Sequence, residues 1–139
     1  MITGKYPSLR LRRSRKSDWS RRLIEENNLT PNDFILPIFL IDGKNKKQAI
    51  KSMPEVYRYS LDKISFIVDK AIKKGLPMIA LFPYTSEKRK NSLGTEALNE
   101  NNLVCKAIRY IKKKYKNEIG IMCDVALDPY TSHGHDGIL

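Results

Sequence analysis

Cysteines are scarce in this sequence and long apolar runs are absent, and each absence excludes a class of protein. The 139 residues include two cysteines, Cys105 and Cys123, which are too few for a disulfide framework and form no C-x-x-C pair. We interpret both as buried structural thiols. No run of about 18 uncharged apolar residues occurs, so the sequence predicts no membrane-spanning helix. The basic start of the chain lacks the apolar segment of a secretory signal, and we therefore expect a cytoplasmic protein.

Acidic residues are few relative to basic ones. The formal net charge is +11, and the residues up to Arg22 contribute eight basic side chains against one acid, Asp18. A field of this sign can attract nucleic acid or anionic lipid. No aromatic residues are interleaved with these charges and no recognition helix accompanies them, so we expect neither a nucleic-acid nor a membrane partner. A second basic cluster, at residues 112–116, closes a predicted helix, where cations suit the negative end of the helix dipole.

The remaining composition is that of a globular protein, with 41% apolar and 29% charged residues. Residues 1–16 show no hydrophobic periodicity, so we expect an extended N-terminal arm that lies against another surface. From residue 17 onward, helical patterns alternate with short apolar runs. The pattern predicts helices over 17–27, 60–74 and 103–115, strands over 34–41, 78–82 and 119–125, and polar loops over 42–59 and 84–102.

Strands that alternate with helices predict right-handed crossovers and a parallel sheet. The predicted strands are apolar on both faces, as in a sheet covered on both sides, although Pro37 counts against a central position for the first of them. About three parallel strands alone would leave open edges and an uncovered face. The sequence also closes on the apolar tail Gly137-Ile-Leu139. We therefore expect an α/β fold that is incomplete within this sequence.

The stretch DVALDPYTSHGHDG, from Asp124 to Gly137, carries the candidate functional residues. Asp124, Asp128 and Asp136 follow the last predicted strand, and functional residues of parallel α/β proteins gather outside the carboxyl ends of strands. Carboxylates that lie close together can hold an ammonium group, bind a metal or transfer protons. The alternative is that Asp128 and the proline after it only begin a turn.

The two histidines of this stretch have two possible roles. His133 and His135 could be zinc ligands, but an H-x-H pair without thiolate companions is a weak signal. The alternative is that both imidazoles form hydrogen bonds within a glycine-rich loop. The sequence by itself leaves both roles open.

Six segments of the chain resemble, in the same order, the porphobilinogen synthase family, also called delta-aminolevulinic acid dehydratase. They are RLRRSRK (10–16), LTPNDFILPIFL (29–40), SMPEVYRYS (52–60), ALFP (80–83), GTEALN (94–99) and DVALDPYTSHGHDG (124–137). The resemblance implies a TIM (β/α)8 barrel whose N-terminal arm wraps a neighbouring subunit in a homo-octamer. It also implies the condensation of two molecules of 5-aminolevulinate into porphobilinogen, a step of haem and other tetrapyrrole biosynthesis. Residues 1–16 would then be the arm, and 17–139 an incomplete barrel domain.

The resemblance also implies roles for single residues. In zinc-dependent members, cysteines occupy the positions of Ala126, Asp128 and Asp136, so this chain resembles the aspartate-rich type. That type lacks an active-site zinc and responds to Mg²⁺, a hard cation that prefers oxygen ligands and that other residues of the family bind. Asp128, Asp136 and Ser132 would bind the second substrate and assist proton transfer. Asp124 would support them from the strand end.

The reaction of this family needs two lysines that form Schiff bases with the substrates. Such lysines need a sheltered site that lowers their pKa. Every lysine of this sequence falls in the arm, in a predicted loop or on a polar helix face. We therefore expect an N-terminal fragment of the enzyme that is inactive alone. The alternative is a non-catalytic metal- or anion-binding module that uses the Asp/His loop and the basic arm.

Overall fold

A computed structural model describes residues 4–137 of the chain, which divides into two compact units, residues 1–30 and 31–139. In the first unit, a single turn η1 (Arg13–Arg15) precedes a short helix α1 (Asp18–Leu23). Ser17 stands at the N-cap in an extended conformation, but its side chain makes no capping hydrogen bond. The helix is shorter than predicted, because it ends at Leu23 and not near Asn27.

Apolar side chains of the first unit are exposed. Among the described residues up to Thr30, Ser20 alone is buried. Its hydroxyl donates to the carbonyl of Ser14, which ties η1 to α1. The large exposed apolar side chains are Tyr6, Leu9, Leu11, Trp19, Leu23, Ile24 and Leu29. The described residues of this unit, 4–30, therefore form no hydrophobic core of their own.

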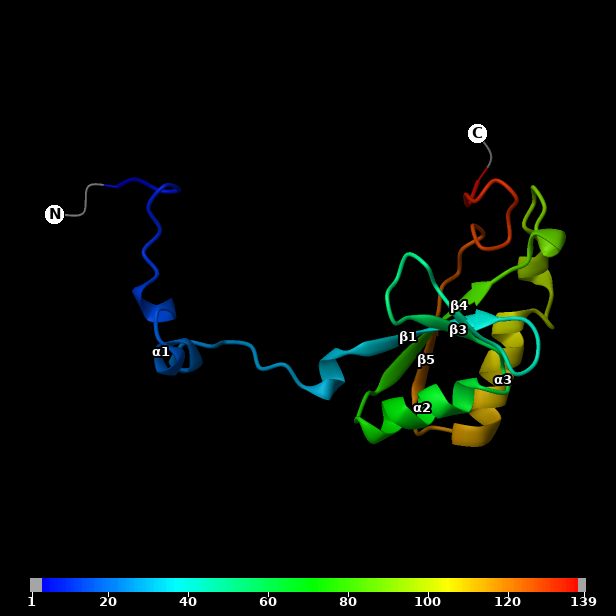
Figure 1. Cartoon of the computed structure of the whole chain (residues 1–139), viewed down its shortest axis with the longest axis horizontal. Coiled ribbons are helices and arrows are strands. Elements are labelled where there is room, and N and C mark those ends of the chain that lie inside the picture. Colours follow the sequence, from blue (N-terminus) through cyan, green and yellow to red (C-terminus); the bar gives the residue numbers. More distant parts are fainter. Residues whose placement is uncertain (1–3, 138–139) are drawn as a thin grey trace. The chain divides into compact units, whose positions relative to one another are not determined.

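The second unit is built on a five-stranded sheet in the order β2-β3-β1-β4-β5 (Figure 1). Its strands are β1 (Ile35–Ile41), β2 (Lys47–Ala49), β3 (Tyr57–Tyr59), β4 (Met78–Tyr84) and β5 (Gly120–Cys123). Its helices are α2 (Ile64–Lys73) and α3 (Leu103–Tyr115), with single turns η2 (Pro31–Asp33), η3 (Glu87–Arg89) and η4 (Thr95–Leu98). Strands β3, β1, β4 and β5 are parallel, and β2 is antiparallel to β3. The predicted parallel α/β fold is confirmed.

The predicted loop over 42–59 is wrong in part, because it contains β2 and β3. Each of these strands has three residues, and none of the six is buried. A strand this short shows no measurable alternation of apolar and polar residues, which is the signal that predicts strands. The pairing of Phe39 with Arg58 and of Leu40 with Tyr59 adds β3 to the sheet beside β1.

Pro37 lies within β1, a strand with neighbours on both sides. It is paired with Ala80 of β4. On the other side of β1, the described pairing with β3 covers only Phe39 and Leu40. At the position of Pro37 the strand therefore has one paired neighbour, and proline is compatible with such an edge-like position.

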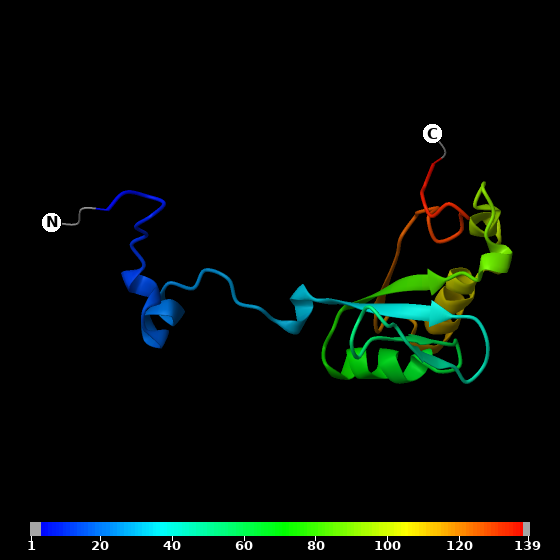
Figure 2. The ribbon, with the colours of Figure 1, turned by 45° about the horizontal axis from the view of Figure 1, so that its top comes forward.

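Helices α2 and α3 cover one face of the sheet (Figure 2). Ile38 and Leu40 of β1 and Ile79 and Leu81 of β4 are almost fully buried against them. The apolar residues of both helices that pack in the core recur at helical spacing: Ile64, Val68, Ala71, Ala107, Ile111 and Tyr115. Gly75 follows α2 with φ +74°, as a glycine that ends a helix in the left-handed conformation does.

The opposite face of the sheet is also apolar but is not covered by these helices. Phe39 and Phe82, which are paired neighbours on β1 and β4, stack with ring centroids 5.6 Å apart. Phe82 is 37% exposed, and Ile35 and Met122 are 44% exposed. The prediction that the strands are apolar on both faces is confirmed.

Candidate functional site at the carboxyl ends of the strands

The carboxyl ends of the parallel strands lie at one edge of the sheet. Asp42, Thr85 and Asp124 directly follow β1, β4 and β5 at this edge. The register pairs Leu81 with Cys123, so the next residue, Asp124, continues the row that contains Phe82. That row belongs to the face opposite the helices. Asp124 is exposed at the end of it.

Asp136 closes the segment 127–136, which we call the acidic loop. Its Oδ1 atom accepts the backbone N–H of Leu127 at 2.6 Å and that of Asp128 at 3.1 Å. These two hydrogen bonds favour the ionised carboxylate and lower the pKa of Asp136. Asp128 and Asp136, predicted to act together, are thus brought together through the backbone of Asp128. Both side chains are exposed.

The acidic loop docks on a second loop, residues 85–99, which we call the template loop. The two loops lie side by side beyond the sheet edge in Figures 1 and 2. Asn91 and Thr131 form a parallel bridge, in which the N–H of Asn91 donates to Tyr130 at 3.3 Å. The N–H of Ser132 donates to the carbonyl of Asn91 at 3.0 Å. Thr131 is 2% exposed, so the centre of this contact is dry.

The imidazole of His133 forms hydrogen bonds within these loops, as one of the two alternatives drawn from the sequence expects for both rings, whereas His135 takes part through its backbone N–H and carbonyl. His133 Nε2 lies 3.1 Å from the carbonyl oxygen of Ser92, and its Nδ1 lies 3.3 Å from the backbone nitrogen of His135. The two rings stack with centroids 6.1 Å apart. Both ring nitrogens of His133 therefore have partners, and ligation of a metal would cost one of these hydrogen bonds.

Over residues 4–137, no group of three or more His, Cys, Asp or Glu side chains is arranged to hold a metal ion. The donors present therefore do not make a site for the Mg²⁺ that the resemblance implies.

Arg89 ties the template loop to the sheet. Its Nη1 atom lies 3.2 Å from Asp42, at the end of β1, and 3.5 Å from Glu96 in η4. Tyr130 of the acidic loop is 9% exposed beside this group, and its burial raises the pKa of the phenol. The cavity between Tyr130 and Thr85 holds about 10 Å³, which is room for a single water molecule and not for a substrate. This cavity is therefore not a binding site for a substrate.

The template loop was not predicted to be part of the site. Asn91 organises it, because its Oδ1 accepts the backbone N–H groups of Leu93 and Thr95, both at 3.1 Å. An Asn followed three residues later by Gly94 is a turn signal that could have located this bend. Arg89, in contrast, gave no signal, because an arginine in a polar loop resembles any solvated residue.

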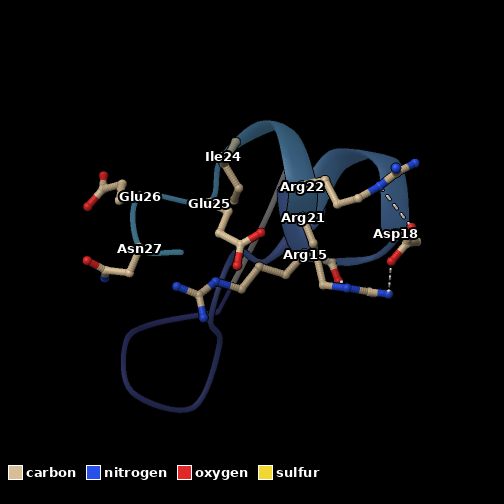
Figure 3. A pocket seen from close by; sticks show the side chains of 8 residues that line it. All are labelled: Arg15, Asp18, Arg21, Arg22, Ile24, Glu25, Glu26 and Asn27. Carbon is tan, nitrogen blue, oxygen red and sulfur yellow. Dashed lines mark hydrogen bonds and ion pairs between the residues drawn. The ribbon is translucent and has the colours of Figure 1, made fainter. Parts of the chain in front are cut away.

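Figure 3 shows a hollow in the first unit that is lined by both arginines and carboxylates. Its lining residues are Arg15, Asp18, Arg21, Arg22, Ile24, Glu25, Glu26 and Asn27. Asp18 forms ion pairs with Arg22 at 3.1 Å and with Arg21 at 3.5 Å. Three arginines face three carboxylates in this hollow, so it offers no excess of positive charge to an anion.

A parallel sheet with helices on its outer face and acidic residues on loops at the carboxyl ends of its strands is an arrangement of the (β/α) barrel class. The structure is similar to the crystal structure of the delta-aminolevulinic acid dehydratase (porphobilinogen synthase) of Toxoplasma gondii ME49 in complex with the reaction product porphobilinogen. The TM-score is 0.82 and the sequence identity 34%, over 94% of this chain and 37% of that chain. The fold therefore matches part of that barrel.

Sequence comparison identifies the family. The family profile described as Delta-aminolevulinic acid dehydratase matches residues 8–139. A delta-aminolevulinic acid dehydratase of Bradyrhizobium diazoefficiens is 54% identical over 95% of this chain, and one of Chlamydia pneumoniae is 40% identical over 94%. The chain belongs to the delta-aminolevulinic acid dehydratase family. It spans 37% and 39% of the lengths of these two relatives.

A chloroplastic delta-aminolevulinic acid dehydratase of Arabidopsis thaliana is 43% identical over 95% of this chain. Within residues 4–137, the structure contains no helix that is long and apolar enough to cross a membrane.

Proposed function

We propose that this chain carries the first strands and the acidic substrate loop of an aspartate-rich porphobilinogen synthase, which joins two molecules of 5-aminolevulinate into porphobilinogen. The supporting observation is the acidic loop, docked at the carboxyl edge of a parallel sheet in a chain of this family. Ala126, Asp128 and Asp136 stand where the zinc-dependent type has cysteines. A loop without thiolates favours an ammonium group over zinc as its ligand.

The hydrogen bonds of Asp136 favour different roles for Asp136 and Asp128. Because the backbone N–H groups at Oδ1 lower its pKa, Asp136 stays ionised at neutral pH, and we assign it to hold the ammonium group of the second substrate. Asp128, whose side chain is exposed beside it, is the candidate for proton transfer. Asp124 would support both from the end of β5. Ser132 is exposed on the same loop and offers a hydroxyl to the substrate.

The family reaction needs amines that this part of the chain does not supply. No lysine among residues 4–137 is buried. The hydrogen bond of Lys114 to Tyr115 raises the pKa of that lysine, whereas a Schiff-base amine needs a lowered pKa. We therefore propose that the 139-residue chain by itself forms no porphobilinogen. Colorimetric detection of porphobilinogen with the purified chain tests this, and a rate above the blank would refute it.

A chimera tests the role of the acidic loop. Residues 8–139 of this chain would replace the matching segment of the Bradyrhizobium relative, which is 54% identical. We expect the chimera to form porphobilinogen, and Asp128→Asn or Asp136→Asn to lower its kcat/KM by roughly a hundredfold or more, as loss of an acid or base group does. Glu118→Gln is the matched control, because Glu118 precedes β5, at the opposite end of that strand.

A folded but inactive chimera would overturn the proposed function. Full activity of both Asp variants would leave the family intact and remove the acidic loop from the mechanism. The fold of each variant is checked by its far-ultraviolet circular dichroism.

We also propose that the first unit contacts a second copy of the chain in a cytoplasmic homo-oligomer, an octamer in the complete enzyme. Its large apolar side chains, including Leu11, Trp19 and Leu23, are exposed and have no core of their own to enter. Mg²⁺ would be bound by residues of the complete enzyme that lie outside this chain, as the resemblance implies.

A further inference from the structure

His133 lies between a backbone hydrogen-bond acceptor and a backbone hydrogen-bond donor. Its Nε2 atom lies 3.1 Å from the carbonyl oxygen of Ser92, which can only accept a hydrogen bond. Its Nδ1 atom lies 3.3 Å from the backbone nitrogen of His135, which can only donate one. A neutral imidazole protonated at Nε2 satisfies both contacts, whereas the Nδ1–H tautomer satisfies neither. The surroundings therefore select one tautomer.

We infer that His133 is a positioning residue, which clasps the acidic loop to the template loop in its Nε2–H tautomer and thereby sets the direction of the Asp136 carboxylate. That Asp136 binds a substrate rests on the proposed function. The two hydrogen bonds of His133 do not depend on it, and they can be measured in the 139-residue chain alone.

A short path of hydrogen bonds leads from His133 to Asp136. The N–H of His135 donates to His133, and the carbonyl of His135 accepts the hydroxyl of Thr131 at 2.9 Å. Both backbone groups of the residue before Asp136 are thus held. From this anchored position, Asp136 Oδ1 reaches the N–H groups of Leu127 and Asp128. Release of His133 would leave His135 with one anchor and would loosen the Asp136 contacts.

The template loop holds the carbonyl of Ser92 in a fixed position next to His133. Asn91 Oδ1 accepts two backbone N–H groups, from Leu93 and Thr95, so the bend that contains Ser92 is held from within. Gly94 has φ +61°, and a Cβ atom there would lie 3.3 Å from Cγ2 of Thr131. The left-handed conformation and the close approach of Thr131 both favour a glycine at this position, and an ordered turn presents the carbonyl of Ser92 to His133.

Two substitutions of His133 each retain one of its two hydrogen bonds. In His133→Asn, the side-chain oxygen can occupy the place of Nδ1 and accept from His135, but the side chain is too short to reach Ser92. In His133→Gln, the amide nitrogen can occupy the place of Nε2 and donate to Ser92, but no acceptor remains for His135. His133→Ala removes both contacts and is the reference for complete loss.

The test combines two measurements on the purified chain. Long-range ¹H–¹⁵N spectra of the imidazole report its tautomer, and we expect the Nε2–H form for His133. Amide hydrogen exchange then reports the backbone. We expect exchange at His135 to accelerate on the order of fivefold or more in His133→Gln and His133→Ala, the effect of one lost hydrogen bond, and to stay near wild type in His133→Asn. The amides of Leu127 and Asp128 should follow His135. Amides of β4 serve as the internal reference for a folded core.

An Nδ1–H tautomer, or equal exchange at His135 in the wild type and all three variants, would overturn the inference. Equal acceleration in the Asn and Gln variants would also overturn it, because the two contacts would then not be separable as stated. These outcomes are independent of the chimera, whose activity judges the proposed function through Asp128 and Asp136.

Discussion

Asp136 folds back across the acidic loop, so that its Oδ1 atom lies 2.6 Å from the backbone nitrogen of Leu127, nine residues earlier in the chain. The same atom accepts from Asp128 at 3.1 Å. One carboxylate oxygen thus closes the loop that carries the predicted substrate contacts.

The acidic loop is expected to open only at a pH below the ordinary pKa of an aspartate. Its contacts lower the pKa of Asp136 in the folded chain relative to the unfolded chain, so their stabilisation is complete above the ordinary carboxyl pKa and is lost as the pH falls through the lowered value. Amide proton shifts of Leu127 and Asp128 should titrate with a midpoint below that of an ordinary aspartate. Asp136→Asn should abolish this titration. A midpoint at or above the ordinary value would contradict the prediction.

Arg89→Gln is expected to loosen the template loop without unfolding the sheet. The guanidinium bridges Asp42 and Glu96 but is 45% exposed, so the cost should be at most about 1 kcal/mol. Faster amide exchange over the template loop, with unchanged exchange in α2, would show it. Lys90→Gln is the control, because Lys90 pairs with Glu87 inside η3 and not with the sheet. Equal effects of the two variants would contradict the prediction.

Tyr115→Phe is expected to destabilise the contact between the two helices. The hydroxyl of Tyr115 donates to Asp69 at 2.7 Å, and the side chain is 5% exposed. Loss of a hydrogen bond to a carboxylate should lower the free energy of unfolding by about 1.5–3 kcal/mol in urea denaturation. Tyr110→Phe is the matched control, since Tyr110 contacts Ser65 from a side chain that is 37% exposed. Its effect should be the smaller of the two.

Asn102→Ala is expected to shorten α3 at its amino end. Asn102 is 4% exposed, and its side chain accepts the backbone N–H of Cys105 at 2.8 Å, as an N-cap residue does. Its loss should cost about 1 kcal/mol of unfolding free energy. Asn102→Ser retains a side-chain acceptor and should recover most of the loss. No difference between the two variants would show that the cap does not stabilise the helix.

The core was predictable from the sequence because its apolar patterns are strong. The stripe from Ile64 to Ala71 in α2 repeats at helical spacing, and β1 and β4 are short continuous apolar runs, as is typical of strands with two apolar faces. β2 and β3 were missed because three-residue strands hold too few side chains for a period to show. Pro37 counted against a central position for β1, because proline cannot donate a hydrogen bond to a neighbouring strand. β3 pairs with β1 only at Phe39 and Leu40, so Pro37 has no partner strand on that side.

The site was predictable only on one of its two loops. The acids of the acidic loop are dense in sequence, and their place after β5 follows from the parallel order of the strands. Ser92 acts through its backbone carbonyl, a group that every residue has, so its side chain does not mark it. His133 was left between two roles, because the choice depends on Ser92, 41 residues away.

The two borders of the sheet differ in direction. β5 forms one border and runs parallel to its neighbour, whereas β2 forms the other and runs antiparallel to β3. A further parallel strand can lie along β5 with every hydrogen bond in the same sense. On the opposite side, a strand that runs in the direction of β1 and β4 would have to pair with β2 in the antiparallel sense. The border at β5 is therefore the one that can accept a further strand without a change of direction.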